Sequence, residues 1–518
     1  MYNAIVNKSN IQDIYKLSPM QSGILFHNLR DSESSAYLGQ MIFTLEGDMD
    51  AEIMAKSYQA LIEKYDVLRT IFLYEKVNQP LQVVLKKRNE SMEYKDISEL
   101  SCIEQREFLA TFLERDQRRG FDLSQGSLVR LTLIKLKDQK YQLVFTNHHI
   151  ILDGWSVSIL IDNLFCNYKS LANKKAINVI QKHGYDEYIK WVETQDQLSG
   201  QDFWKNYLNG YNNVASIPQY GNQSESKNGY CTELIKLNAS IKEKLITLAK
   251  TSNVTLNTIF QVIWGILLQR YNNTDDVVFG GVVSGRPAEL KNVESIVGLF
   301  INTVPIRIKS KDGESFKELI KRVQKESLES EPYHYVSLPD IQVSSMLPTN
   351  FINHIFVFEN FPISNRNFDP NSKFNISEIT GYEHTHYDLN IEIVNLNEIE
   401  ISITYNSQKY QQEQILQILK HLYQIVVNVT EENDYSDILT RKERGQLLVE
   451  FNNTEAEYPD NQTIHEIFEA QVVKTPNAIA VEYEEKKVTY AELNRRANQL
   501  ARVLRKRGVE KDSFVGLM

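Results

Sequence analysis

Residues 147–156 read Asn-His-His-Ile-Ile-Leu-Asp-Gly-Trp-Ser (NHHIILDGWS) and lie between two predicted elements of different type. The preceding residues 141–147 (YQLVFTN) are rich in apolar and β-branched side chains, which predicts a strand. The apolar residues that follow recur at helical spacing, which predicts a helix over 157–171. Because α/β proteins place reactive groups where strands end before helices, this stretch indicates both an α/β fold and a candidate site.

The chemistry of this stretch is open to three interpretations. His148 and His149 are the only adjacent pair among the ten histidines. In the first interpretation, both are structural groups at the end of a strand. In the second, His149 and Asp153 are metal ligands, although a metal site needs three or four ligands. In the third, one imidazole performs acid–base chemistry while Asp153 holds the local structure, and Gly154 lets a ligand approach the backbone N–H.

The alternation of strand and helix patterns continues outward from this stretch. Strands are predicted at 41–45 (MIFTL) and 127–136 (SLVRLTLIKL), and a helix is predicted at 51–65. Polar or turn-rich residues predict boundaries or long loops at 173–182, 209–229 and 439–462.

A new pattern begins after residue 462. It predicts a helix, a strand, a turn, a strand and a second helix, with Gly508 at the position of a helix C-cap. Residues 513–517 (SFVGL) resemble the beginning of a buried strand whose partners are missing. We therefore expect the chain to be a fragment that is cut inside a following domain.

Composition excludes several classes of protein. The 518 residues suffice for several domains, and the hydrophobic and charged fractions, 42 % and 24 %, are those of ordinary globular proteins. The 57 basic residues against 67 acidic ones give a net charge of −10, which argues against a nucleic-acid-binding protein.

Targeting and membrane segments are not predicted. The first residues contain no apolar signal-peptide core, and the most apolar stretch, 254–271, is interrupted by polar residues and predicts a buried helix. The three cysteines, Cys102, Cys166 and Cys231, are odd in number and far apart, so we expect no disulfide framework and a cytoplasmic location.

The segment His148–Gly154 (HHIILDG) resembles the HHxxxDG motif of nonribosomal peptide synthetase condensation domains. Further stretches resemble other motifs of that family and occur in its order: 17–27 (LSPMQSGILFH), 64–72 (KYDVLRTIF), 185–191 (YDEYIKW), 283–287 (VSGRP) and 297–307 (VGLFINTVPIR). The similarity extends from residue 11 to about residue 440. One departure is Tyr65-Asp66, where the commoner pattern has His-Glu. Residues 488–493 (VTYAEL) resemble the first motif of an adenylation domain.

This resemblance implies a fold and a domain organisation. The implied fold class is α/β, with two chloramphenicol-acetyltransferase-like sandwich lobes arranged as a V and a small α/β fragment of a following domain. The corresponding ranges are 1–180 for the first lobe, 181–440 for the second lobe, 441–462 for a linker and 463–518 for the truncated start of an adenylation domain.

The resemblance also implies an activity, which is formation of a peptide bond between two carrier-bound thioesters by an amide-synthesising acyltransferase. His149 is the expected acid–base residue, the Gly154 N–H a candidate oxyanion donor, and His148 structural. Asp153 is expected to form a structural ion pair with Arg286 or Arg69. No metal and no cofactor of the chain's own is expected, because the phosphopantetheine arms belong to the carriers.

The implied partners are an upstream donor carrier domain, a downstream acceptor carrier domain and an adenylation domain in the same chain. We also expect a docking helix of an upstream synthetase to bind the first 20 or so residues, if Met1 is the natural start; a boundary within a longer polypeptide is the alternative. The chain is expected to be a monomer with no nucleic-acid or membrane partner.

Two alternative functions stay open. An epimerisation domain shares the HHxxxDG motif and the carrier-bound substrates, but it normally precedes another condensation domain. A non-catalytic carrier-docking module is the alternative of a different class, and the intact His149 argues against it.

Overall fold

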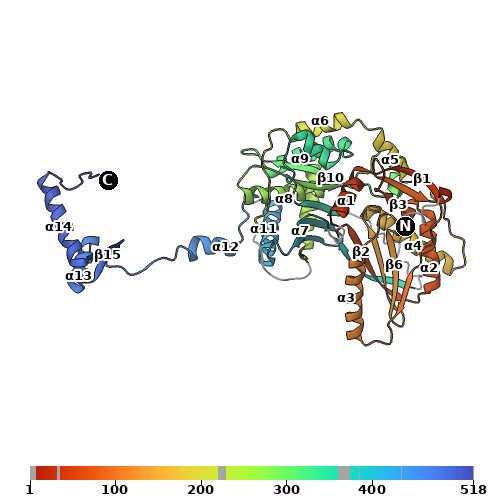
Figure 1. Cartoon of the computed structure of the whole chain (residues 1–518), viewed down its shortest axis with the longest axis horizontal. Coiled ribbons are helices and arrows are strands. Elements are labelled where there is room, and N and C mark those ends of the chain that lie inside the picture. Colours follow the sequence, from red (N-terminus) through yellow and green to blue (C-terminus); the bar gives the residue numbers. More distant parts are fainter. Residues whose placement is uncertain are drawn as a thin grey trace. The chain divides into compact units, whose positions relative to one another are not determined.

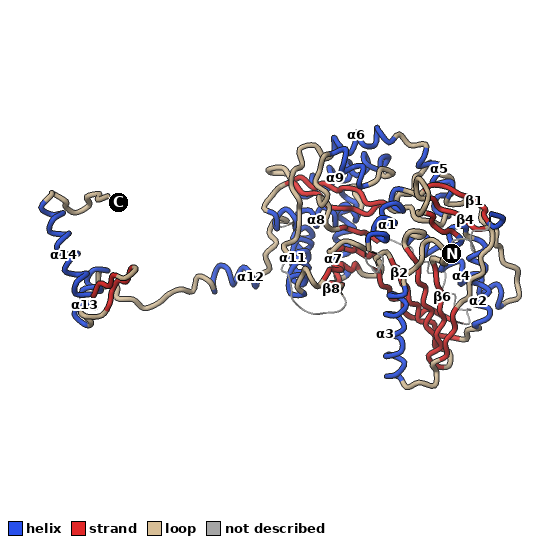
Figure 2. The backbone as a smooth tube through the Cα atoms, viewed as in Figure 1, coloured by secondary structure: helices blue, strands red, loops and turns tan. Residues whose placement is uncertain are grey.

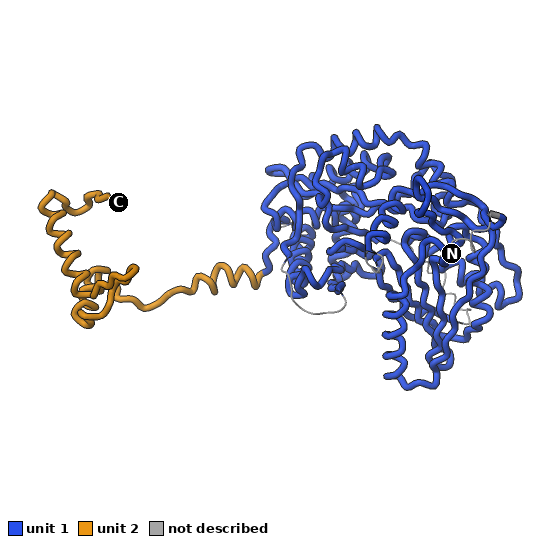
Figure 3. Tube along the Cα trace, in the orientation of Figure 1, with its two compact units in different colours: residues 1–440 blue, residues 441–518 orange. Residues whose placement is uncertain are grey.

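The computed structural model describes residues 8–31, 36–219, 229–359, 374–383, 385–432 and 434–516. Contacts divide the chain into two compact units, Met1–Thr440 and Arg441–Met518, which are coloured separately in Figure 3. Each unit is described by itself. Of the residues expected to receive a docking helix, 1–7 lie outside the described part of the chain.

The first lobe of unit 1 is built on a five-stranded sheet with the strand order β12-β2-β7-β6-β5 and a smaller sheet with the order β1-β4-β3. Its elements are η1 (Lys8–Asn10), β1 (Ile11–Lys16), α1 (Pro19–Arg30), β2 (Leu38–Gly47), α2 (Ala51–Lys64), η2 (Asp66–Arg69), β3 (Thr70–Leu73), β4 (Leu81–Leu85), β5 (Glu93–Asp96), α3 (Cys102–Arg119), β6 (Val129–Lys137), β7 (Lys140–His148) and α4 (Gly154–Ala172). The predicted strands at 41–45, 127–136 and 141–147 correspond to β2, β6 and β7.

The second lobe is built on a six-stranded sheet with the order β10-β9-β11-β13-β14-β8. Figure 1 shows its green and cyan elements beside the red and orange elements of the first lobe. Its elements, with β12, are α5 (Asp186–Glu193), α6 (Gln197–Tyr207), β8 (Tyr230–Leu237), α7 (Ala239–Ser252), α8 (Leu256–Asn272), β9 (Asp276–Val283), η3 (Val293–Ser295), β10 (Asn302–Lys309), α9 (Phe316–Ser330), η4 (Glu331–Tyr333), α10 (Leu338–Ser345), β11 (Ile355–Glu359), β12 (Phe374–Glu383), β13 (Leu389–Asn395), β14 (Ile399–Asn406) and α11 (Gln412–Thr430). The prediction of an α/β protein with two lobes is confirmed.

One strand joins the two lobes. β12 lies within the range expected for the second lobe, yet it pairs antiparallel with β2 of the first-lobe sheet, from Phe374 opposite Gly47 to Glu383 opposite Gly39. Gly39 is in turn opposite Asn147 at the end of β7. The division into lobes therefore does not follow the chain order, and β12 brings Glu383 beside the histidine pair.

The most apolar stretch of the sequence is a buried helix. It forms α8, whose N-cap Thr255 accepts a hydrogen bond from the backbone N–H of Thr258. Twelve consecutive residues of α8, from Thr258 to Gln269, are buried among α7, α9, α11 and the six-stranded sheet. Among the described residues, no helix is long and apolar enough to cross a membrane.

Unit 2 has the predicted succession of helix, strand, strand and helix (Figure 2). Its elements are α12 (Arg441–Gly445), η6 (Gln446–Glu450), α13 (Ile464–Lys474), β15 (Ile479–Tyr483), β16 (Lys486–Thr489) and α14 (Tyr490–Lys506). The first ten residues of the expected linker are thus helical. Residues 513–516, expected to begin a strand, form none, because a strand needs a neighbour with which to pair.

Candidate functional site

The histidine segment links the end of β7 to the beginning of α4. β7 ends at His148, and α4 begins at Gly154, six residues later. Asp153 is the N-cap of α4, and its carboxylate accepts a hydrogen bond of 2.8 Å from the Ser156 N–H. An aspartate in this position satisfies a helix N–H that has no intrahelical partner, so the sequence itself defines where the helix begins.

The Asp153 carboxylate is held by groups from the second lobe. Nη2 of Arg286 lies 3.2 Å from its Oδ1, and the Phe300 N–H donates to its Oδ2 over 3.0 Å. Asp153 is 1 % exposed and the Arg286 side chain 7 %. Arg286 also donates to the Val293 and Ile296 carbonyls. The ion pair is therefore buried, and both terminal nitrogens of Arg286 are hydrogen-bonded while its Nε has no partner among the described residues, so additional hydrogen bonds offset most of the cost of burying the two charges.

Ser156 links the turn around Asp153 to the second-lobe loop that contains Gly298. Its hydroxyl donates to the Gly298 carbonyl over 2.7 Å and accepts the Gly298 N–H over 3.0 Å. Arg286 donates to this hydroxyl as well, over 3.0 Å. Ser156 thus completes a hydrogen-bonded joint between the lobes and, being fully buried, is not placed as a nucleophile.

Two glycines make this joint possible. A Cβ on Gly298 would lie 2.0 Å from the ring of Tyr185, which packs directly against the loop. Gly285 has φ +58°, and a Cβ there would lie 1.9 Å from the Phe300 carbonyl oxygen. The glycines of the 283–287 and 297–307 motifs thus allow the close approach that places Arg286 against Asp153.

Arg69 is not at this site. Its guanidinium contacts the Asp66 carboxylate and donates to the Ile62 and Leu85 carbonyls. Of the two arginines expected as partners of Asp153, the structure brings Arg286 to it and not Arg69. Arg69 instead joins the end of α2 to β4, because it donates to carbonyls of both elements, those of Ile62 and Leu85.

His148 is buried and electrically neutral. Its Nδ1 accepts a hydrogen bond of 3.1 Å from the Ile150 N–H. Burial, with a smaller contribution from the neighbouring His149, lowers the pKa of His148 to about 3. Such a group stays uncharged at neutral pH and fits the structural role expected for it.

His149 is held at both ring nitrogens. Its Nδ1 lies 3.0 Å from the Leu152 carbonyl oxygen; since a carbonyl only accepts, Nδ1 carries a proton. Its Nε2 lies 2.7 Å from Oε1 of Glu383, and the two groups form an ion pair when the ring is protonated. The backbone N–H of His149 donates to the Tyr37 carbonyl over 2.8 Å.

The surroundings of His149 shift its protonation. Burial opposes a charge on the ring and lowers the pKa, but the facing Glu383 carboxylate, followed by the Leu152 carbonyl and Asp153, raises it more. The net result is a pKa above the ordinary value of 6.5. The two adjacent histidines are therefore pushed in opposite directions, a pattern typical of functional sites.

Gly154 is the first residue of α4. The N–H groups of a helix's first turn favour negative charge, and the role of the Gly154 N–H as an oxyanion donor stays a prediction. Within the described ranges, no group of three or more His, Cys, Asp or Glu residues could hold a metal ion.

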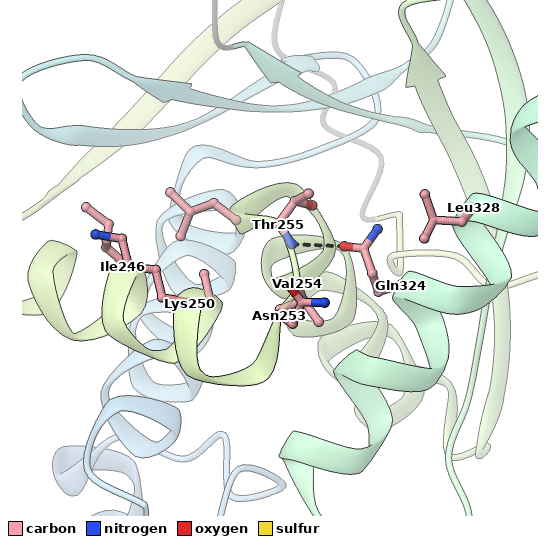
Figure 4. A pocket seen from close by; sticks show the side chains of 9 residues that line it. Ile246, Lys250, Asn253, Val254, Thr255, Gln324 and Leu328 are labelled. Carbon is pink, nitrogen blue, oxygen red and sulfur yellow. Dashed lines mark hydrogen bonds between the residues drawn. The ribbon is translucent and has the colours of Figure 1, made fainter.

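A separate hollow of about 500 Å³ lies among the ends of α7, α8 and α9. Figure 4 shows its lining, in which the Thr255 N–H donates to the Gln324 side chain over 2.9 Å. The lining contains none of the site residues predicted from the sequence.

Sequence reasoning missed Glu383, Ser156 and Gly298. No local signal marks Glu383, because a glutamate at a strand end is ordinary. Gly298 lies in a stretch that the resemblance had already singled out, and its spacing to Phe300 could have pointed to a tight loop.

The architecture and the histidine turn between two lobes define a protein of the chloramphenicol-acetyltransferase-like class. The family model described as "Condensation domain" matches residues 11–447, and the model described as "AMP-binding enzyme" matches residues 468–518. The chain belongs to the condensation-domain family of nonribosomal peptide synthetases, followed by a short segment of an AMP-binding enzyme.

Relatives among curated proteins are large synthases. The chain is 39 % identical over 524 residues to gramicidin S synthase 2 of Brevibacillus brevis, and 38 % identical over 523 residues to tyrocidine synthase 2 of Brevibacillus parabrevis. In both cases 99 % of this chain is covered, but it spans only 12 % and 15 % of those relatives.

Solved structures show the same fold. A four-domain nonribosomal peptide synthetase bound to AMP and glycine matches with a TM-score of 0.73 and 18 % identity, covering 96 % of this chain and 39 % of that chain. The first condensation domain of the calcium-dependent antibiotic synthetase, in complex with a substrate analogue, matches with a TM-score of 0.69 and 15 % identity, covering 83 % of this chain and 98 % of that chain.

Proposed function

We propose that this chain condenses an upstream aminoacyl or peptidyl thioester with the amine of a downstream aminoacyl thioester, both on carrier phosphopantetheine arms. The observation that carries the proposal is the fixed orientation of His149. Its Nδ1–H points to the Leu152 carbonyl, so the neutral ring keeps its lone pair on Nε2, the nitrogen that can accept a proton.

The reaction does not need a strong base. A free α-amine has a pKa of about 7.7–8.0, so part of it is neutral at pH 7. The amine attacks the donor thioester carbonyl, the C–N bond forms, and the thiolate of the donor arm leaves. His149 takes a proton from the attacking nitrogen and the Gly154 N–H stabilises the developing oxyanion.

The remaining groups hold this arrangement. Asp153 and Arg286 fix the turn that carries His149, and the buried His148 accepts a hydrogen bond from the Ile150 N–H of the same turn. The chain needs no cofactor of its own for this reaction, because the phosphopantetheine arms arrive with the donor and acceptor carriers. The adenylation segment in the same chain fits this place in a synthetase, and the docking of an upstream synthetase at the first 20 or so residues remains part of the proposal.

The test supplies a donor aminoacyl carrier and a separate acceptor aminoacyl carrier to the chain. Intact mass measurement of the acceptor carrier should show a dipeptidyl adduct. If the only change is inversion at the α-carbon of a carrier-bound amino acid, detected by chiral analysis after thioester cleavage, epimerisation replaces condensation. Binding of carriers with neither product would identify a docking module.

A further inference from the structure

Strand pairing places one carboxylate opposite the histidine turn. β12 runs antiparallel to β2, with Glu383 opposite Gly39, and Gly39 is opposite Asn147. His149 follows two residues after Asn147. A residue more than 230 positions away in the chain is thus brought to Nε2 of His149 by sheet register alone, because β12 is the edge strand of that sheet.

The contact occupies the nitrogen that the reaction needs. Oε1 of Glu383 lies 2.7 Å from Nε2, while Nδ1 is engaged by the Leu152 carbonyl. The His149 side chain is only 9 % exposed, whereas the Glu383 side chain is 53 % exposed. The imidazole is therefore fixed by its surroundings, and the carboxylate is the partner that has room to move.

The other titratable groups around the pair leave Glu383 as the anion in contact with His149. Asp153 is committed to Arg286, and His148 is neutral. On the neighbouring strands of the second lobe, Glu359 of β11 and Glu392 of β13 contact each other, and burial followed by repulsion among the carboxylates, Glu383 included, raises the pKa of both.

We propose that Glu383 is a positioning residue of the condensation reaction: it holds the His149 ring from β12 in the unloaded enzyme and gives up its place at Nε2 to the acceptor amine. This proposal rests on the proposed function of His149. While the pair is intact, Glu383 favours the protonated ring. When the amine arrives, the carboxylate swings toward solvent, the ring loses this stabilisation of its charge, and the Nε2 proton passes to water. The lone pair that this leaves on Nε2 then accepts the proton of the attacking amine.

Glu383→Gln tests the proposal, because it removes the charge and keeps the shape. Glu378→Gln, an exposed glutamate on the same strand, is the matched control. The first readout is the titration of His149 by NMR of histidine-labelled chain, with the resonance assigned by its absence in His149→Ala. We expect its midpoint to fall by about one pH unit in Glu383→Gln, the usual size for loss of an adjacent opposite charge. Glu378→Gln should leave it in place.

The second readout is the pH profile of kcat/KM with a loaded donor carrier and an acceptor aminoacyl-pantetheine thioester. Its acidic limb should move down in Glu383→Gln by the same amount, so that the ratio of kcat/KM at pH 5.5 to that at pH 8 rises about tenfold. Glu383→Asp, which keeps the charge, should restore the limb toward that of the unaltered chain.

The two readouts separate this inference from the proposed function. An unchanged NMR titration in Glu383→Gln, or an acidic limb that stays in place, overturns the role of Glu383. If His149→Ala turns over normally, the function proposed for His149 fails instead. The NMR titration does not depend on turnover, so it tests the role of Glu383 even if the Glu383→Gln chain has no activity.

Discussion

The two ion pairs at the ends of the histidine segment differ in how firmly they are held. Asp153 and Arg286 are buried, and Asp153 has further hydrogen bonds to two backbone N–H groups. His149, just after β7, and Glu383 of β12 are brought together across β2, which pairs with both strands, but the Glu383 carboxylate is half exposed. The Asp153–Arg286 pair therefore maintains the structure, because separating a buried and largely hydrogen-bonded pair costs much free energy, whereas a half-exposed carboxylate can exchange its partner for water.

The largest effect should come from His149→Ala. We expect dipeptidyl-carrier formation to fall by about 10²–10⁴-fold, the usual contribution of a placed proton acceptor, with the melting temperature little changed. The measurement is single-turnover product formation on loaded carriers. His183→Ala is the control, since it also removes a histidine–glutamate contact, the one with Glu187 at 3.1 Å. Equal rates in His149→Ala and His183→Ala would show that the His149–Glu383 pair has no special role in the reaction.

Asp153→Ala should lower both the stability of the fold and the rate of dipeptidyl-carrier formation. Removing one partner leaves Arg286 buried and unpaired, which costs about 3–5 kcal/mol of unfolding free energy in denaturant titrations. Asp50→Ala is the matched control, because Asp50 caps α2 in the same way but is exposed and should cost only about 1 kcal/mol. Full stability of Asp153→Ala together with lost activity would instead make Asp153 a direct participant in catalysis.

Ser156→Ala should have an intermediate effect on stability. It leaves the buried Gly298 N–H without its hydroxyl partner, which costs about 1–3 kcal/mol by thermal or chemical unfolding. The acidic limb of the pH profile should stay in place, because the His149–Glu383 pair is intact. Ser158→Ala, in the same helix and only part-buried, is the reference and should be close to neutral.

Glu383→Gln should change stability least, and only in acid. Because the pKa of His149 is raised in the folded state, the pair contributes fully below the unfolded value near 6.5, and its contribution is lost as the pH rises through the folded value. The unfolding free energies of the two chains should therefore differ by about 1 kcal/mol at pH 5.5, as expected for a pKa difference of about one unit, and converge by pH 8.5. If the difference in unfolding free energy grows with pH, the prediction that Glu383 stabilises the protonated His149 ring is wrong.

Much of the local structure followed from residue pattern. The apolar spacing after residue 156 predicts α4, and Asp153 with Ser156 three residues later is a helix start that needs no tertiary contact. The polar 441–462 stretch was expected to be a linker, and its helical first half shows that a charged, turn-free run still forms a local helix. Strand β12 was not predicted, because its exposed, glutamate-bearing face gives a weak pattern.

The histidine pair, the Asp-Gly turn and the strand-to-helix junction that presents them could be predicted from residue pattern, since they depend on neighbours a few residues apart. By contrast, the contact of Asp153 with Arg286 instead of Arg69, and the contact of His149 with Glu383, could be found only in the folded chain. Those choices depend on loop packing around Gly298 and on the register of β12 against β2, which join residues 130 and more positions apart. Local propensity does not predict such pairings, because burial and hydrogen bonding across the whole fold select them.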